Sequence, residues 1–217
     1  MLKHRRLRLP RPSNIVPIDS EDPCPYYYSR WTGWAYRQRL KMAISLLDSQ
    51  DVGDLLEIGY GSGIFLPELA RHCRRLSAVD IHEGAATVSA MLEAEGTEAR
   101  LLTGDVRALG LSDCSFDGVI CLSVLEHLAT HDLALAASEI QRVARPGGTI
   151  VLGYPVRNVF TDGFYQFVGF AARDIHPSSH QDIKSAVAQS LSIERVVHFP
   201  AWLPEDLSWY VALRCRK

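Results

Sequence analysis

The sequence predicts an α/β fold in which a mostly parallel β-sheet carries helices on both faces. Apolar runs of strand length alternate along the chain with segments whose apolar residues recur at helical spacing. The run from Phe116 to Val124 is almost wholly apolar, as expected of a central strand that is buried on both faces. Three alternate glycines, Gly59, Gly61 and Gly63, join an apolar strand to the next expected helix. These features indicate one layered domain organised around the glycine turn.

Length and charge limit the number of domains and the kinds of partner. The chain has 217 residues, 47% of them hydrophobic, which is enough for one well-buried domain and too few for two of ordinary size. The net charge of −2 gives no general field that would attract nucleic acid, so nucleic acid is not expected as a partner. A single domain is therefore expected over residues 26–217, with the oligomeric state left open.

Residues 1–25 differ in composition from the rest of the chain. They contain five prolines, and residues 1–11 contain five basic and no acidic residues. This proline-rich tail is expected to lie along the surface or in solvent. Contact of residues 1–11 with a membrane surface or with RNA is the alternative to a simply solvated arm.

Residues 26–47 are expected to form an aromatic segment followed by a helix. Tyrosines and tryptophans are dense from Tyr26 to Tyr36, and apolar residues then recur at helical spacing to Leu47. Two interpretations of the aromatic residues remain open. They could form a lid that keeps water from a bound ligand, or they could pack against the sheet as core.

The glycine turn predicts a ligand site. Glycine at every second position permits a sharp turn and brings bare backbone close to a ligand, while the following helix points its free N–H groups to the same place. Asp80 ends the next apolar run, 17 residues after Gly63, where a carboxylate can accept hydrogen bonds from ribose hydroxyls. A dinucleotide site requires G-x-G-x-x-G, but Ile64 occupies the position of the third glycine. The pattern therefore favours a nucleoside ligand other than a dinucleotide.

The remaining segments continue the alternation of helix and strand. The helix after the glycine turn is expected to carry an apolar face from Phe65 to Cys73 and a basic C-terminal group of Arg71, Arg74 and Arg75. Thr130 is expected to cap a helix that ends at the Arg145-Pro146-Gly147-Gly148 turn. The other expected elements are strands at 76–79, 100–103, 116–124, 149–153, 193–199 and 208–214, and helices at 84–96 and 183–191.

Several ordered motifs resemble one enzyme family. The stretch Glu57 to Gly63 reads Glu-x-Gly-x-Gly-x-Gly and resembles the first motif of the class I S-adenosylmethionine-dependent methyltransferases, in particular the methyltransferase type 11 group. The resemblance continues through residues 50–154 at Gly104-Asp105-Val106, Ser115 to Ile120, Leu125 to Leu128 and Pro146 to Thr149. It implies a Rossmann-like, doubly wound, seven-stranded and mostly parallel sheet with an antiparallel edge hairpin.

The resemblance also implies S-adenosyl-L-methionine as the cofactor and identifies the residues that would bind it. Asp80 resembles the family's ribose-binding acid, and Asp105 with Val106 resembles its adenine-contacting segment. The full expected cofactor-binding set is Glu57, Gly59, Tyr60, Gly61, Gly63, Asp80, Ile81, Asp105, Val106 and Leu122.

The acceptor is expected to be a small molecule. An aromatic stretch from Phe160 to Phe170 lies within an expected insert or cap over residues 157–180, and it suggests an apolar acceptor such as a quinone, polyketide or lipid precursor. If the acceptor is a hydroxyl, a general base would help. The candidates are His127, His131, His176 and His180, of which His127 and His176 are preferred. The alternatives are a methyltransferase that acts on a macromolecule and a non-catalytic S-adenosylmethionine-binding interaction protein.

The sequence gives no sign of a metal site, a membrane span or a disulfide framework. No helix carries two histidines at metal-binding spacing, and no run approaches the ~18 apolar residues needed to cross a bilayer. The five cysteines are scattered and lack C-x-x-C spacing, which favours reduced thiols. Cys121 is expected to be a small core residue. A cytoplasmic protein is the expectation.

Overall fold

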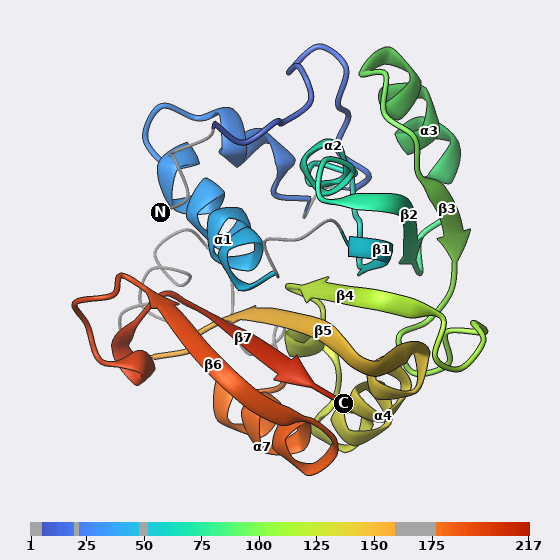
Figure 1. Cartoon of the computed structure of the whole chain (residues 1–217). Coiled ribbons are helices and arrows are strands. Elements are labelled where there is room, and N and C mark those ends of the chain that lie inside the picture. Colours follow the sequence, from blue (N-terminus) through green and yellow to red (C-terminus); the bar gives the residue numbers. More distant parts are fainter. Residues whose placement is uncertain (1–5, 20–21, 48–51, 159–176) are drawn as a thin grey trace.

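The computed structural model describes residues 6–19, 22–47, 52–158 and 177–217, and within them one sheet of seven strands forms the centre of the molecule (Figure 1). The strand order is β3-β2-β1-β4-β5-β7-β6. Strands β1 to β5 run parallel, and β7 is antiparallel to both of its neighbours, β5 and β6. The strands are β1 Val52–Ile58, β2 Cys73–Asp80, β3 Arg100–Thr103, β4 Phe116–Leu122, β5 Ala144–Pro155, β6 Ser192–Phe199 and β7 Tyr210–Arg216.

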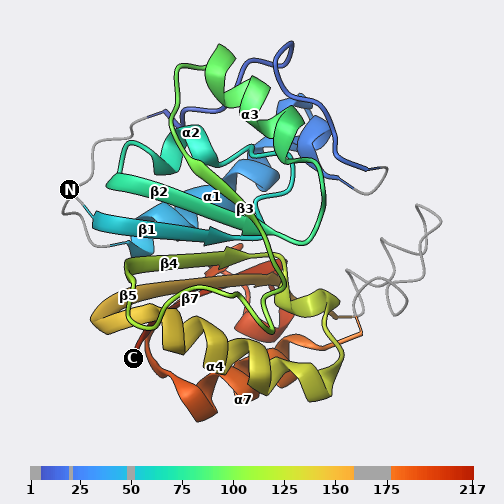
Figure 2. The same ribbon diagram turned by 90° about the vertical axis from the view of Figure 1, so that its right-hand side faces the viewer.

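Helices cover both faces of this sheet (Figure 2). Helices α4 and α7 lie on one face, and α1, α2 and α3 lie on the other. The α-helices are α1 Gly33–Leu46, α2 Leu66–Leu69, α3 Ala85–Ala94, α4 Leu133–Val143 and α7 His180–Ser190. Short 3-10 helices are η1 Cys24–Tyr28, η2 Leu125–His127, η3 Thr130–Asp132 and η4 Glu205–Leu207. No helix within the described ranges is long and apolar enough to span a membrane.

Alternation of side chains along the central strands builds two hydrophobic cores. In β1, Leu55 packs on the face covered by α1, α2 and α3, and Leu56 packs on the face covered by α4 and α7. In β4, Ile120 and Cys121 divide in the same way, and both are almost fully buried. Because both faces of these strands are covered, their apolar runs are nearly continuous. The expectation that Cys121 is a core residue is confirmed.

The sheet reverses its direction of winding between β1 and β4. From β1 the chain adds β2 and then β3 on one side, and it returns to place β4 on the other side of β1. Ligands of open α/β sheets bind beyond the carboxyl ends of the strands at such a point. Gly59, Asp80 and Ser123 directly follow or end the three strands concerned, so their segments meet at this edge.

The helix after the glycine turn is shorter than the sequence predicts. Helix α2 has only four residues, and Cys73, Arg74 and Arg75 belong to β2 rather than to the end of a helix. Cross-strand contacts explain the difference, because the backbone N–H of Val52 donates to the carbonyl oxygen of His72 at 2.9 Å. The Arg75 guanidinium also donates to Asp54 of β1 at 2.7 Å. Pairing with β1 therefore overrides the helical spacing of the apolar residues.

Two other helix starts differ from the predictions. Thr130 begins the 3-10 turn η3 instead of capping α4, and the Asp132 carboxylate accepts a hydrogen bond from Arg107 at 2.8 Å. Helix α7 begins at His180, before the expected position 183, because Ser179 and Asp182 form a reciprocal capping box. The expected turn from Arg145 to Gly148 is also not a turn between elements, because α4 ends at Val143 and β5 begins at Ala144, five residues before the expected strand 149–153. The remaining strand and helix predictions agree with the structure to within a few residues.

The N-terminal segment 6–19 lies against α2 and α3 (Figure 1). The backbone N–H of Arg8 donates to the buried carboxylate of Glu68 at 2.7 Å, and the Asn14 amide donates to Glu95 at 2.7 Å. Ile15 is buried in the same core as the glycine turn. The segment is therefore packed on the body of the protein by specific polar and apolar contacts.

Candidate active site

The three glycines of the turn all have left-handed backbone conformations, with φ of 81° at Gly59, 50° at Gly61 and 76° at Gly63. A Cβ atom at Gly59 would lie 2.1 Å from Val124, and one at Gly63 would lie 2.7 Å from Val88. At Gly61, by contrast, nothing lies within 4 Å of the added Cβ. The first and third glycines thus serve close packing, whereas the second presents bare backbone to open space, where a ligand can approach.

The carboxylate of Asp80 holds the turn in place. It accepts a hydrogen bond from the N–H of Gly61 at 2.7 Å and another from the N–H of Ile81 at 2.7 Å. A carboxylate has about four acceptor positions. With a third and longer bond from the N–H of His82 at 3.4 Å, the carboxylate still keeps capacity for a further donor, such as a hydroxyl group of a ribose. The backbone N–H of Gly104 donates to the Asp80 carbonyl oxygen at 2.9 Å, which joins the end of β3 to the same place.

His82 is a second support of the turn that sequence reasoning missed. Its Nδ1 accepts a hydrogen bond from the N–H of Gly84 at 2.9 Å, and this bond assigns the ring proton to Nε2. Nε2–H then donates to the carbonyl oxygen of Gly61 at 3.0 Å. Gly61 is therefore held at its N–H by Asp80 and at its carbonyl oxygen by His82. The ring of His82 also makes an edge contact with Tyr60, with ring centres 4.9 Å apart.

Glu57, at the end of β1, is a buried acid beside the turn. Burial, and then the negative charge of Asp80, raise its pKa from 4.5 to about 8. Its Oε2 atom has no hydrogen-bond partner among the described residues. Burial of a largely protonated carboxyl group with an unsatisfied oxygen lowers the stability of the folded chain. It becomes favourable when a cationic ligand stabilises the ionised form.

A half-buried cation lies beyond the carboxyl end of β4. Helix α1 brings Arg39 over the rings of Tyr27 and Tyr36, with its guanidinium carbon 5.0 and 5.2 Å from the ring centres. Arg39 donates to the Tyr27 hydroxyl at 2.5 Å and to the Ser123 hydroxyl at 3.2 Å. The Ser123 hydroxyl lies 3.1 Å from that of Tyr210, and Ser123 itself has a positive φ of 58°.

The hydrogen-bond partners of Arg39 are neutral. Burial raises the pKa values of Tyr27 and Tyr210, so both phenols stay neutral near neutral pH. Through the described part of the chain, no carboxylate lies within salt-bridge distance of Arg39. An arginine with only neutral partners at a ligand-binding edge is suited to a carboxylate. This role could not be predicted from the sequence, because Arg39 is one of several basic residues on its helix.

The other expected cofactor residues divide into two groups. Ile81 directly follows Asp80 and its side chain is 68% exposed, so it can cover a flat group bound at the turn. Leu122 is half-buried at the end of β4. Asp105 is held by Arg107, whose guanidinium lies 2.6 Å away and lowers the Asp105 pKa. Val106 is buried in the core, which leaves its backbone as the part that a ligand can reach.

Only one of the two preferred candidate bases falls within the described residues. His127 ends η2, just after β4, and its side chain is exposed. His176 lies outside the described residues, as does the aromatic stretch from Phe160 to Phe170. The neighbour of His127, Glu126, is buried, and burial raises its pKa from 4.5 to about 8. The structure thus places a second buried acid near the site without giving it a hydrogen-bond partner for Oε2 among the described residues.

The aromatic residues from Tyr26 to Tyr36 do not share one environment. Tyr27 is fully buried in the core, while the side chains of Tyr26, Trp31 and Trp34 are 52%, 87% and 49% exposed. The core interpretation therefore applies to Tyr27 alone among these four. Tyr26 stacks on Tyr36 with ring centres 5.4 Å apart, which fixes the segment beside Arg39.

Comparison with known proteins matches the central part of the chain to one kind of domain. Residues 56–152 match the family model of a methyltransferase domain. The chain is 35% identical over 108 residues to a demethylmenaquinone methyltransferase of Roseiflexus castenholzii, covering 49% of this chain and 44% of that protein. It is 30% identical over 126 residues to a malonyl-[acyl-carrier protein] O-methyltransferase of Serratia marcescens, covering 58% and 46%. The chain thus spans less than half the length of these curated relatives.

Solved structures match a larger share of the chain. The N-methyltransferase NodS of Bradyrhizobium japonicum, in complex with S-adenosyl-L-homocysteine, superposes with a TM-score of 0.67 and 21% identity, covering 91% of this chain and 93% of NodS. An S-adenosylmethionine-dependent methyltransferase of Clostridium acetobutylicum superposes with a TM-score of 0.69 and 13% identity, covering 90% and 95%. At these identities the likeness concerns the fold.

Proposed function

Because the chain belongs to the class I S-adenosylmethionine-dependent methyltransferases, we propose that it transfers a methyl group from S-adenosylmethionine to a small apolar acceptor. The family, the fold and the cofactor that the sequence predicts are confirmed. The observation that carries the proposal is the open side of Gly61, whose backbone is held in a left-handed turn by Asp80 and His82.

The residues at this edge fit the cofactor in charge and in shape. Its nucleoside would lie against Gly61, with its ribose hydroxyls donating to Asp80 and its base near Ile81, Asp105 and Val106. The methionine carboxylate would pair with Arg39, which has only neutral partners among the described residues. The unsatisfied Oε2 of Glu57 suits the positive charge that the cofactor carries.

The chemistry that this cofactor supplies is a methyl group already activated on a sulfonium. The task of the chain is then to hold donor and acceptor in line and to exclude water, and positioning of this kind can supply about 7–11 kcal/mol of the barrier. If the acceptor is a hydroxyl group, a general base would add roughly 10²–10⁴ in rate. His127 and His176 remain our proposals for that base.

An apolar acceptor is supported by two independent observations. Matched relatives include a demethylmenaquinone methyltransferase and a ubiquinone biosynthesis O-methyltransferase, whose names refer to quinones. In addition, aromatic side chains surround the carboxyl end of β4, where Tyr27, Tyr36 and Tyr210 contact Arg39 or its partners. We therefore propose a quinone, polyketide or lipid precursor as the acceptor class.

The proposal is tested by turnover. The chain is incubated with S-adenosylmethionine and a panel of quinols, phenols and fatty-acid derivatives, and S-adenosylhomocysteine and the methylated product are measured by mass spectrometry. We expect turnover with an apolar member of the panel and none with the Gly61→Val variant. Cofactor binding without turnover of any acceptor in the panel would instead support a non-catalytic binding protein. Absence of cofactor binding would refute the proposal.

A further inference from the structure

All four tryptophans of this chain are exposed to solvent. The exposed fractions of their side chains are 87% at Trp31, 49% at Trp34, 81% at Trp202 and 43% at Trp209. Tryptophan is highly buried on average because its large apolar ring gains much from leaving water. The chain thus exposes to solvent a set of side chains that other proteins bury, and such exposed aromatic side chains indicate a binding surface.

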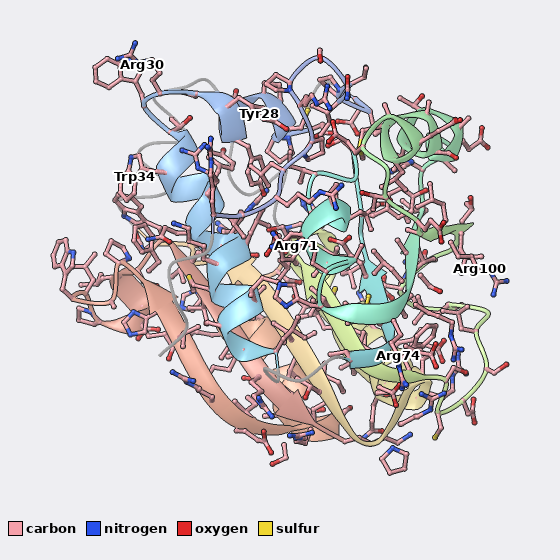
Figure 3. All side chains as sticks on the ribbon, turned by 45° about the horizontal axis from the view of Figure 1, so that its top comes forward. Tyr28, Arg30, Trp34, Arg71, Arg74 and Arg100 are labelled. Carbon is pink, nitrogen blue, oxygen red and sulfur yellow. The ribbon has the colours of Figure 1, made fainter. Side chains whose placement is uncertain are left out.

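Trp34 and Trp209 meet where the start of α1 contacts the connection between β6 and β7, and Trp31 and Trp202 belong to the same two segments of the chain. The ring of Trp34 lies 5.5 Å from Phe199 and 6.1 Å from Trp209, measured between ring centres. Trp31 precedes α1 by two residues, and Trp202 follows Phe199 by three. Figure 3 shows Trp34 and Arg30 on the same side, pointing away from the sheet. We call Trp31, Trp34, Phe199, Trp202 and Trp209 the tryptophan face.

The charge around the tryptophan face is positive. Residues 26–47 contain four basic residues and no acidic residue. Within the described ranges, Arg30 and Lys41 have no ion-pair partner, and Lys41 lies seven positions after Trp34, on the same side of α1. Of the two acids in the β6–β7 connection, Glu205 pairs with Lys184 at 2.7 Å. Asp206, whose side chain is 71% exposed, lies 3.1 Å from the His180 ring and is the one acid near the face without a lysine or arginine partner among the described residues.

We propose that the tryptophan face binds to the surface of an anionic lipid bilayer. Indole rings favour the boundary between water and lipid, where the ring is apolar and the N–H stays near polar groups. Unpaired arginine and lysine side chains beside them are attracted by anionic headgroups, at about 1 kcal/mol each near the surface. A second copy of this chain fits less well, because two positive faces would repel each other.

This inference is separate from the proposed methyl transfer, because membrane binding needs neither cofactor nor acceptor. It also differs from contact through the basic residues 1–11, which carry no tryptophan. If both proposals hold, the membrane would bring an apolar acceptor close to the edge of the sheet where β5, β7 and α1 meet.

The test uses the intrinsic fluorescence of the full chain, since every tryptophan that can report belongs to the tryptophan face. The protein is mixed with phosphatidylcholine vesicles that contain or lack phosphatidylglycerol, and with vesicles that contain phosphatidylglycerol and brominated phosphatidylcholine, which quenches indoles that enter the bilayer. Binding is measured in parallel by sedimentation of the vesicles. We expect binding to the anionic vesicles, a blue shift of the emission and quenching by the brominated lipid.

Variants decide which surface is responsible. The double substitution Trp31→Ser with Trp202→Ser removes two almost fully exposed side chains, so it should fold normally and lower the partition coefficient by about tenfold or more. Leu135→Ser is the matched control, because Leu135 is 52% exposed on α4, on the other face of the sheet, and this variant should bind normally. Arg30→Glu should weaken binding to anionic vesicles alone.

Three outcomes would overturn the proposal. The first is no binding of the unmodified chain to anionic vesicles. The second is binding that survives the double tryptophan substitution but disappears when Lys3, Arg5 and Arg6 are replaced by serine, which would assign the contact to residues 1–11. The third is a dimer in gel filtration that the double substitution turns into a monomer, without vesicle binding, which would make the face an interface between copies.

Discussion

Replacement of Glu57 by glutamine should stabilise the chain and at the same time weaken cofactor binding. The folded pKa of Glu57 is about 8, above its value of 4.5 in the absence of burial. The folded chain therefore keeps a proton that the unfolded chain releases, and stability falls as the pH rises through the window from about 4.5 to about 8. Each pH unit is worth about 1.4 kcal/mol, so at pH 7 the cost is about 3 kcal/mol. Glutamine resembles the protonated form and avoids this cost.

The same substitution should act in the opposite direction on the ligand. A cationic cofactor favours the ionised form of Glu57, so its binding should release a proton and strengthen as the pH rises toward 8. Glutamine cannot ionise, and the affinity should become lower and independent of pH over this range. A gain in stability of the folded chain together with a loss of affinity for the cofactor is expected if the buried acid serves ligand binding.

Glu126→Gln is the matched control, because Glu126 is also buried and its pKa is also raised to about 8. It should gain stability in a similar way, while the proton that Glu57 releases on cofactor binding should still be released. Urea unfolding at about pH 5 and about pH 8 measures the first effect. Calorimetry in two buffers with different ionisation enthalpies measures the proton release. The reasoning is refuted if Glu57→Gln keeps the pH slope of stability that the unmodified chain shows.

Three further substitutions test the geometry of the site. Gly61→Val should abolish measurable cofactor binding with a loss of stability of about 1–2 kcal/mol. The control Gly96→Val, at a similar φ of 58° and also in open space, should lose similar stability and bind normally. Equal binding by both variants would contradict the role of Gly61. Asp80→Ala should weaken cofactor binding by roughly 1–3 kcal/mol in calorimetry. It should also lower the melting temperature, because the Gly61 and Ile81 N–H groups lose their acceptor. Unchanged binding would show that Asp80 does not contact the cofactor. Arg39→Lys keeps the charge but not the forked geometry, so it should raise the KM for S-adenosylmethionine about tenfold with little change in kcat. An altered kcat at normal KM would instead indicate that Arg39 contacts the methyl acceptor.

The sequence allowed the fold to be predicted because local pattern and global topology agree along most of the chain. The apolar run of β4, the glycine turn and the alternation of strand and helix each follow from neighbouring residues alone. Where a contact between distant segments decides the outcome, the prediction was wrong. Cys73 to Arg75 follow a helical apolar pattern, yet pairing with β1 draws them into β2.

The candidate site could be predicted only as far as its motif reaches along the chain. Glu57, the three glycines and Asp80 lie in one recognisable stretch and the strand after it. Arg39 and His82 carry no such signal, because each acts through a residue far away in the sequence, Ser123 for Arg39 and Gly61 for His82. Their importance appears only once the fold brings α1 and the end of β2 to the same edge. The assignment of His127 as a base stays a prediction.

The segment 6–19 has a practical consequence for anyone who works with this protein. Helix α2, which directly follows the glycine turn, has only four residues, and its buried Glu68 accepts a hydrogen bond from the backbone of Arg8. Protease cleavage between Arg8 and Asn14 would separate the contact with Glu68 from the contact with Glu95 without touching Gly61. Loss of cofactor binding after mild digestion would therefore point to this segment before any residue of the site.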